Sequence, residues 1–382
     1  MKVMIVVTHL LGTGHLSRAL TLGRAFKAVG DEVQIVSGGF AAPQLDTDGI
    51  GLVQLPPLRS DGVNFTQLLN AVGDLADATY HLQRQAMLCQ ALRCLQPDVL
   101  ITELYPFGRR SLRHEFLALL HAAKALPRPP TILASIRDIL APPSKPEKVS
   151  KADQVIADFY DGVLVHSDPQ ATRLELSWPV SDMLADKLHY TGFVAPSSAG
   201  PHPNAEGRGE ILVSAGGGSV GDEIYHCALA AAQQMPGHPW RLLVGGSDAE
   251  ERIAQLSQIP SPARIEPARS DFRQVLSHVA ASVSMCGYNT ALDLLQAEVP
   301  AVLIPFDAGK EVEQSLRAKS LTPLPGFEAI RTAELTPERL IEAVTKVIAA
   351  PRRSAARFQF DGARRVVEIA HDLAQPQAGA QV

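Results

Sequence analysis

Residues 284–318 read SMCGYNTALDLLQAEVPAVLIPFDAGKEVEQSLRA. A glycine turn at Gly287 precedes a helical pattern, then a buried strand over Ala301–Ile304 and a Pro-Phe loop that opens another helix. A helix N-terminus beside a glycine turn offers free N–H groups to an anion. Asp293 lies further along the same helix, where a carboxylate can accept from sugar hydroxyls. The stretch therefore predicts alternating strands and helices around a site for a phosphate and a sugar.

The same alternation runs through the whole chain. Expected strands cover Val3–Thr8, Glu32–Ser37, Val99–Thr102, Thr131–Ser135, Gly162–His166, Glu210–Ser214, Arg241–Gly245, Arg264–Glu266 and Ala281–Ser284. Expected helices include Leu16–Val29, Thr79–Leu95, Asp222–Gln234, Asp271–His278 and Ala355–Leu373. Buried strands that alternate with helices predict an α/β fold whose parallel sheets are covered on both faces.

A break in composition divides the chain. Residues 195–209, APSSAGPHPNAEGRG, are rich in residues that interrupt helices and ladders. We expect two Rossmann-like parallel-sheet domains that face a cleft, because the strands' carboxyl ends form the ligand edge of such sheets. The predicted boundaries are an N-terminal domain over 1–195, a linker over 196–209, a C-terminal domain over 210–352, and a helix over 353–375 that packs back toward the first domain.

Composition excludes several classes of protein. The 382 residues are 46% hydrophobic and 20% charged, a soluble globular profile large enough for two domains. A net charge of −5 argues against nucleic acid as the main partner. The four cysteines lack C-x-x-C spacing, so we expect reduced thiols in a cytoplasmic protein and neither zinc nor disulfides. No apolar run approaches the roughly 20 residues that span a bilayer, so membrane contact would be peripheral.

Two glycine-rich loops follow expected strands. The loop over 9–18, HLLGTGHLSR, places His15 at a helix start, where the helix dipole disfavours a charged imidazole. A neutral histidine there can take a proton from a hydroxyl, although a helix-capping role is the simpler alternative. The loop over 214–221, SAGGGSVG, predicts a phosphate cradle without the Lys-Ser/Thr ending of a P-loop. Its alternative is a tight turn that needs glycine.

A third loop, over 102–110, offers Glu103 as an acid or hydroxyl binder. Arg109, Arg110 and Arg113 form a basic cluster beside Tyr105 and Phe107. Such a cluster could meet an anionic acceptor or a membrane surface, but a solvated helix face is the commoner reason for one. The Arg-Asp pair at 137–138 is more simply a structural ion pair.

Together these motifs resemble the GT-B glycosyltransferases, in particular the MurG-type family 28 that contains the peptidoglycan UDP-N-acetylglucosamine transferase. The family's first loop ends in Gly-His, as in Gly14-His15 here. Its S-x-x-G-x-x-T-x-x-E helix is matched by Ser284, Gly287, Thr290 and Asp293, with Asp in place of the usual Glu. The chain is also similar to bacterial predicted glycosyltransferases that carry HLLGxGHLxRA, TELxPFGRR and S-x-RDIL, here residues 9–19, 102–110 and 135–140.

The loops and the resemblance together predict which residues form the site. The predicted catalytic residues are His15, which matches the family's histidine, and Glu103, which the loop over 102–110 offers. The implied donor-binding residues are Gly216, Gly217, Gly218, Ser219, Ile265, Gly287, Asn289, Thr290, Asp293, Glu313 and Gln314. The implied acceptor-binding residues are Gly12, Thr13, Gly14, Tyr105, Arg109 and Arg110.

The resemblance also implies the reaction. A sugar would pass from a nucleotide diphosphate sugar, expected to be a UDP-sugar, to an acceptor hydroxyl, with inversion and without a metal or any other cofactor. The acceptor would be lipid-linked or a polysaccharide, met in the cytoplasm or at the inner face of the membrane. Two alternatives stay open: a UDP-sugar 2-epimerase of the same fold, and a non-catalytic nucleotide-sugar-binding protein.

Overall fold

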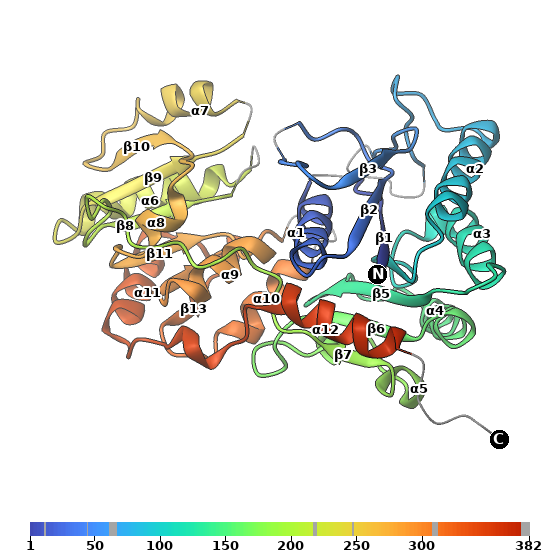
Figure 1. The fold of residues 1–382 in the computed structure, drawn as a ribbon. Helices are drawn as coiled ribbons and strands as arrows, with labels where there is room; N and C mark the ends of the chain where they lie inside the picture. The colour runs from blue at the N-terminus through green and yellow to red at the C-terminus, as the bar shows by residue number, and fades with distance from the viewer. Residues whose placement is uncertain are drawn as a thin grey trace. The chain divides into compact units, whose positions relative to one another are not determined.

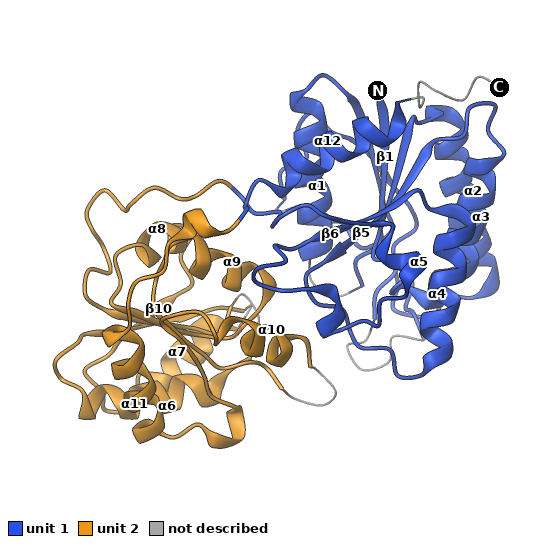
Figure 2. Ribbon diagram, turned by 90° about the horizontal axis from the view of Figure 1, so that it is seen from below, with its two compact units in different colours: residues 1–196, 359–382 blue, residues 197–358 orange. Residues whose placement is uncertain are grey.

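The computed structural model describes residues 1–10, 13–43, 45–60, 67–216, 220–246, 248–307 and 312–375. The chain forms two compact units, coloured separately in Figure 2. Unit 1 comprises Met1–Pro196 together with Gln359–Val382, and unit 2 comprises Ser197–Phe358. Both units are built on parallel sheets with helices between the strands, which confirms the predicted α/β class.

In unit 1 the described residues form a seven-stranded parallel sheet in the order β3-β2-β1-β4-β5-β6-β7. Its strands are β1 (Lys2–Val7), β2 (Glu32–Ser37), β3 (Gly51–Gln54), β4 (Val99–Glu103), β5 (Thr131–Arg137), β6 (Gly162–His166) and β7 (Leu188–Tyr190). Its helices are α1 (Gly14–Ala28), α2 (Ala78–Leu95), α3 (Arg113–Lys124), α4 (Pro146–Phe159), α5 (Asp182–Ala185) and α12 (Gly362–Ala374).

The two faces of this sheet bury different sets of apolar side chains. Helices α1 and α12 cover one face, and α2, α3 and α4 cover the other (Figure 2). Alternation along each strand sends Val99 and Ile101 of β4 to the α1 face and Leu100 to the opposite face. Glu103 continues the α1-facing series, so the strand delivers its last side chain toward the start of α1.

The C-terminal helix begins later than predicted. The expected helix over Ala355–Leu373 is wrong in its first turns, because α12 starts at Gly362. The backbone before it is used for pairing: the N–H of Phe193 donates to the carbonyl of Gln359 at 2.7 Å, and Val194 forms a bridge with Asp361. The helix then packs on α1 and β5 of unit 1.

Unit 2 repeats the architecture with a six-stranded parallel sheet of described residues, ordered β10-β9-β8-β11-β12-β13. Its strands are β8 (Ile211–Ser214), β9 (Trp240–Val244), β10 (Arg264–Pro267), β11 (Ala281–Ser284), β12 (Ala301–Leu303) and β13 (Phe327–Ala329). Its helices are α6 (Asp222–Gln234), α7 (Ala249–Leu256), α8 (Phe272–Leu276), α9 (Tyr288–Gln296), α10 (Glu313–Leu321) and α11 (Pro337–Ala349). Helices α6 and α11 cover one face, and α8 and α9 the other (Figure 2).

A buried ion pair holds the loops at the carboxyl edge of unit 1. Arg84 of α2 is fully buried and donates to both carboxylate oxygens of Glu115 on α3, at 2.9 and 3.0 Å. Its remaining N–H groups donate to the carbonyl of Gly38, at 3.0 Å, and to that of Pro56. One guanidinium therefore ties the segments that follow β2 and β3 to two helices.

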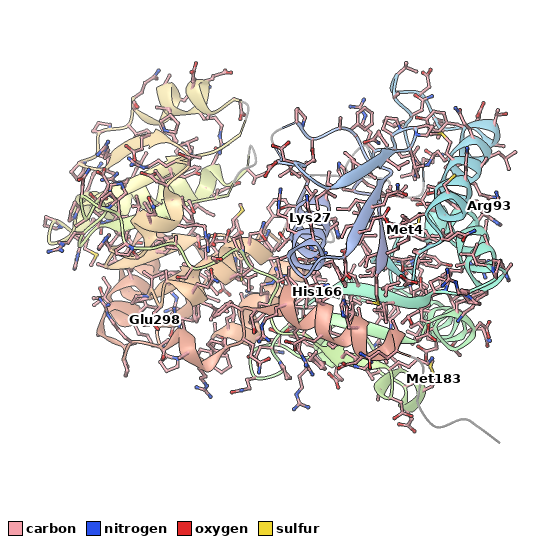
Figure 3. The ribbon with its side chains drawn as sticks, viewed as in Figure 1. Met4, Lys27, Arg93, His166, Met183 and Glu298 are labelled. Atoms are coloured by element: carbon pink, nitrogen blue, oxygen red, sulfur yellow. The ribbon has the colours of Figure 1, made fainter. Side chains whose placement is uncertain are left out.

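We predict that Arg84→Ala lowers the unfolding free energy of unit 1 by about 3–5 kcal/mol, because it leaves a buried carboxylate without its partner. The chain has two tryptophans, Trp178 in unit 1 and Trp240 in unit 2. In a Trp240→Phe background, urea unfolding followed by Trp178 fluorescence reports on unit 1. Arg93→Ala, an exposed arginine on the same helix (Figure 3), is the control. Equal losses for both variants would contradict the prediction.

Candidate active site

The sheet of unit 1 brings its candidate residues together at its carboxyl edge. Strand β4 ends at Glu103, and β1, its neighbour in the sheet, leads into the loop before α1. Helix α1 begins at Gly14, so His15 lies in its first turn. The fold thus places the histidine of one loop and the acid of another side by side.

His15 and Glu103 form a hydrogen-bonded pair. Nδ1 of His15 lies 2.9 Å from Oε1 of Glu103, and the guanidinium of Arg18 donates to the same oxygen. The side chain of Glu103 is 2% exposed and that of His15 14%. An ionised carboxylate only accepts hydrogen bonds, so we assign the imidazole proton to Nδ1. Nε2 is then the basic nitrogen of His15.

Burial and charge set the protonation of this pair. Burial lowers the pKa of His15 to about 4, although the hydrogen bond and charge of Glu103 oppose the shift. Burial alone would raise the pKa of Glu103, but Arg18 and His15 outweigh it and hold that pKa well below its usual range. At neutral pH the site therefore contains a neutral imidazole hydrogen-bonded to a carboxylate, an arrangement suited to accepting a proton.

The predicted acceptor-binding residues separate into two groups. The first group lies near His15: Thr13 and Gly14 are at the start of α1, and Arg109 donates from Nε to the carbonyl of Thr8 at 2.6 Å. Gly12 lies outside the described residues. Burial lowers the pKa of Arg109 to about 10, with Glu103 opposing. Arg110, by contrast, is exposed and donates to the carbonyl of Phe107.

The aromatic residues beside the basic cluster are parts of the core. The ring of Tyr105 stacks on Phe116 with centroids 4.5 Å apart, and Phe107 packs edge-on against Trp178. Both rings are almost completely buried. Tyr105 thus packs the interior of unit 1, and neither ring adds an exposed aromatic surface to the arginines.

In unit 2 the second glycine loop is fixed at both ends. Its entrance is held by the N–H of Ala215, which donates to the phenol oxygen of Tyr225 at 3.1 Å. Its exit is held by Arg252, which donates to the carbonyl of Val220 and to Asp222. Gly216 is exposed with a φ of +81°, in the left-handed region that favours glycine. Gly217, Gly218 and Ser219 lie outside the described residues.

Helix α9 begins at the predicted place. Gly287 is its N-cap residue, and Asn289 and Thr290 lie in its first turn. One turn later Asp293 is half-buried and accepts from Nε of Arg273 at 2.8 Å. Burial raises the pKa of Asp293, while Arg273 opposes the shift.

Two further predicted donor residues, Glu313 and Gln314, lie at the start of α10. Oε1 of Gln314 accepts from two backbone N–H groups, those of Cys286 at 2.9 Å and Phe306 at 3.1 Å. The Gln314 side chain therefore joins the loops that follow β11 and β12. Glu313 is paired with the buried Arg317 at 2.8 Å. The other predicted member, Ile265, is partly buried on β10.

Comparison with known proteins identifies this arrangement. Residues 212–373 match the glycosyltransferase family 28 C-terminal domain. The Acinetobacter baumannii MurG structure aligns over 97% of this chain and 99% of its own, with a TM-score of 0.63 and 16% identity. The glycotransferase of kitacinnamycin aligns over 98% and 99%, with a TM-score of 0.66 and 17% identity. The fold is GT-B.

Curated relatives confirm the predicted resemblance to family 28. A UDP-N-acetylglucosamine–N-acetylmuramyl-(pentapeptide) pyrophosphoryl-undecaprenol N-acetylglucosamine transferase of Brucella anthropi is 27% identical over 183 residues. That alignment covers 44% of this chain and 48% of the relative. The transferase of the same name from Exiguobacterium sibiricum is 29% identical over 141 residues, 36% of this chain and 39% of that relative. The chain thus spans about half the length, or less, of these relatives.

Three arginines of this GT-B chain were not assigned from its sequence. Arg18 follows His15 by three residues, a spacing that places both on one face of α1. Arg317 follows Glu313 by four residues, a spacing that likewise places both side chains on one face of α10. Arg273 lies on a different helix from Asp293, so its contact depends on the tertiary fold and has no local signal.

Within the described ranges, no group of three or more His, Cys, Asp or Glu side chains is arranged to hold a metal ion. In that same part of the chain, no helix is both long and apolar enough to cross a membrane.

We predict that Glu103→Gln lowers the pKa of His15 below its value of about 4, because it removes the nearby negative charge that favours the imidazolium. Glutamine keeps an oxygen that can accept from Nδ1. Histidine ring NMR over acidic pH would measure the shift in the free protein. Glu147→Gln, on α4 of the same unit, is the control. A raised or unchanged pKa of His15 would contradict the role given to Glu103.

Proposed function

We propose that the protein transfers a sugar from a nucleotide diphosphate sugar to an acceptor hydroxyl. The observation that carries the proposal is the pair of a neutral imidazole and a buried carboxylate, His15 and Glu103, at the ligand edge of a GT-B unit. The family 28 match over residues 212–373 supports the same reaction. Because the matched relatives are covered only in part, their donor and acceptor enter here as part of the proposal.

Unit 2 would bind the donor. Backbone N–H groups at the start of α9, beside Gly287, and those of the glycine loop after Gly216 would meet the diphosphate. Asp293, which accepts from Nε of Arg273, would also accept from ribose hydroxyls. We take the donor to be a UDP-sugar, because the Brucella relative is named for UDP-N-acetylglucosamine.

Unit 1 would activate the acceptor. Nε2 of His15 takes the proton of the acceptor hydroxyl while its oxygen bonds to the anomeric carbon. The bond from that carbon to the diphosphate breaks, and the diphosphate leaves with the electron pair. A single displacement of this kind inverts the anomeric centre, and the N–H groups of unit 2 replace a metal in stabilising the leaving group.

The proposed acceptor carries a hydroxyl on a lipid-linked or polysaccharide molecule. The name of the Brucella relative includes pyrophosphoryl-undecaprenol, which supports a lipid-linked acceptor met at the inner face of the membrane. Arg109 beside the acid-base pair would suit an anionic group on such a molecule.

We predict that His15→Ala lowers turnover by about 10²–10⁴-fold, because it removes the base, while UDP binding changes little. Transfer is measured as UDP release that depends on added acceptor, and UDP affinity by calorimetry. His114→Ala, on an exposed helix position of the same unit, is the control. Unchanged turnover in the His15 variant would overturn the base assignment. Isomerised UDP-N-acetylglucosamine formed without acceptor would indicate the epimerase instead.

We predict that Asp293→Asn weakens UDP binding by about 10-fold or more, because a hydrogen bond to a charged acceptor becomes a neutral one. Asp293→Glu restores the residue that the family usually carries and should retain binding. A thermal-shift series with UDP, GDP and dTDP gives the nucleobase preference, since a ligand of the folded state raises its melting temperature. UDP affinity that is equal in the Asn variant and the parent protein would remove Asp293 from the donor site.

A further inference from the structure

We propose that Ser135, His166 and Thr191 are positioning residues that orient and polarise Glu103, and through it the proposed base His15. With Glu103 they form a continuous chain of hydrogen bonds, which we call the buried row. The inference rests on the proposed function for its effect on turnover, but its geometry and its first test do not involve any substrate.

The register of the parallel sheet creates the buried row. Glu103 of β4 pairs directly with Ser135 of β5. Ser135 pairs with Leu164 of β6, two residues before His166, so both point to the same face. Thr191 follows β7 and lies beside His166, with its N–H bonded to the carbonyl of Val165. Four neighbouring strand ends thus each contribute one polar side chain.

The four side chains are linked at hydrogen-bond distance. Ser135 Oγ lies 2.6 Å from Glu103 Oε2 and 2.9 Å from His166 Nε2. His166 Nδ1 lies 3.0 Å from Thr191 Oγ1. All four residues are at most 2% exposed. On the same face below them lie apolar core residues of the strands, so the row closes the carboxyl end of the α1-side core. Figure 3 labels His166 within unit 1.

Glu103 determines the direction of the two bonds that Ser135 makes in the row. Its ionised carboxylate only accepts, so the single proton of Ser135 points to Oε2. Ser135 Oγ must then accept from Nε2–H of His166. Burial holds His166 in its neutral form by lowering its pKa to about 3, so its unprotonated Nδ1 faces the Thr191 hydroxyl, which also reaches the carbonyls of Gly192 at 2.7 Å and Val165 at 3.3 Å. The protons of Ser135 and His166 therefore point toward Glu103.

The direction of these hydrogen bonds affects the pKa of His15 through the charge on Glu103. Ser135 binds one carboxylate oxygen, and His15 and Arg18 bind the other. The Ser135 bond fixes the plane of the carboxylate and draws negative charge away from the oxygen that faces His15. Removing that donor leaves more charge on Oε1, which stabilises the His15 imidazolium and raises the pKa of His15. Loss of Glu103 itself has the opposite sign.

Three arginines also act on the charges around His15, Glu103 and His166. Their effect must stay constant when the pKa of His15 is compared between variants. Arg18 acts from α1, and it disfavours the charged forms of both His15 and His166. Arg109 acts on His15 from the loop after β4, and Arg137 at the end of β5 acts on Arg109. None of these three arginines is changed in the variants below.

The first experiment is histidine ring NMR of the free protein. In the parent protein we expect His166 in its Nε2–H tautomer and neutral down to pH about 4. Ser135→Ala should raise the pKa of His15 by about one unit, whereas Ser135→Thr, which keeps the hydroxyl, should leave it unchanged. A fixed His15 pKa in a folded Ser135→Ala protein, judged by Trp178 fluorescence, would overturn the proposal.

The second experiment is the pH dependence of sugar transfer. Ser135→Ala should lower kcat by about 10-fold, with the donor KM little changed and the acid limb of kcat/KM moved upward. His166→Leu should also lower kcat and move the acid limb upward, but by less. His166→Gln should keep kcat and the acid limb close to those of the parent protein, because the glutamine amide nitrogen can donate to Ser135 in place of Nε2. Reduced stability without a moved acid limb, or no rescue by Gln, would leave the residues with a structural role only.

The two experiments separate this inference from the proposed function. An upward shift of the His15 pKa in a protein that transfers no sugar would refute the transferase and leave the buried row standing. Active transfer with an unmoved His15 pKa in Ser135→Ala would refute the row and leave the transferase standing.

Discussion

The buried carboxylate of Glu103 is the constraint on which unit 1 depends. An ionised acid that is 2% exposed needs several donors, because water cannot solvate it. Arg18 and His15 supply two from α1, and Ser135 supplies a third from the neighbouring strand. The start of α1 is thereby fixed against the end of β4 at the ligand edge of the sheet.

In unit 2, long polar side chains hold the loops by hydrogen bonds to their backbone groups. Gln314 accepts from the N–H groups of two loops, and Arg317 donates to the carbonyl of Cys286. Arg252 holds the exit of the glycine loop in the same way. Long polar side chains therefore join the loops that follow adjacent strands, and they fix the backbone N–H groups of Cys286 and Phe306.

Local patterns predicted much of this structure, and contacts between distant segments account for the rest. Alternating apolar strands and helices predicted both sheets, and His15 and Glu103 were each chosen from their own loops. Their contact requires β4 to lie next to β1, which no local pattern encodes. Strands β3, β7 and β13 were not predicted because they are short edge strands with at most one fully buried residue each. The late start of α12 likewise follows from pairing with residues far away in the chain.

The electrostatics of His15 have a consequence for the proposed reaction. Burial keeps the imidazole neutral at physiological pH, but a pKa of about 4 makes it a weak base. Such a base can accept an alcohol proton only late in the displacement, when the attacking oxygen has donated electron density to the new bond and its proton has become acidic. Departure of the diphosphate must therefore supply much of the driving force. This places the main catalytic demand on the N–H groups beside Gly216 and Gly287. Glu103 opposes the lowering of the His15 pKa and so keeps the imidazole basic enough to accept the proton, while Ser135 fixes the orientation of Glu103.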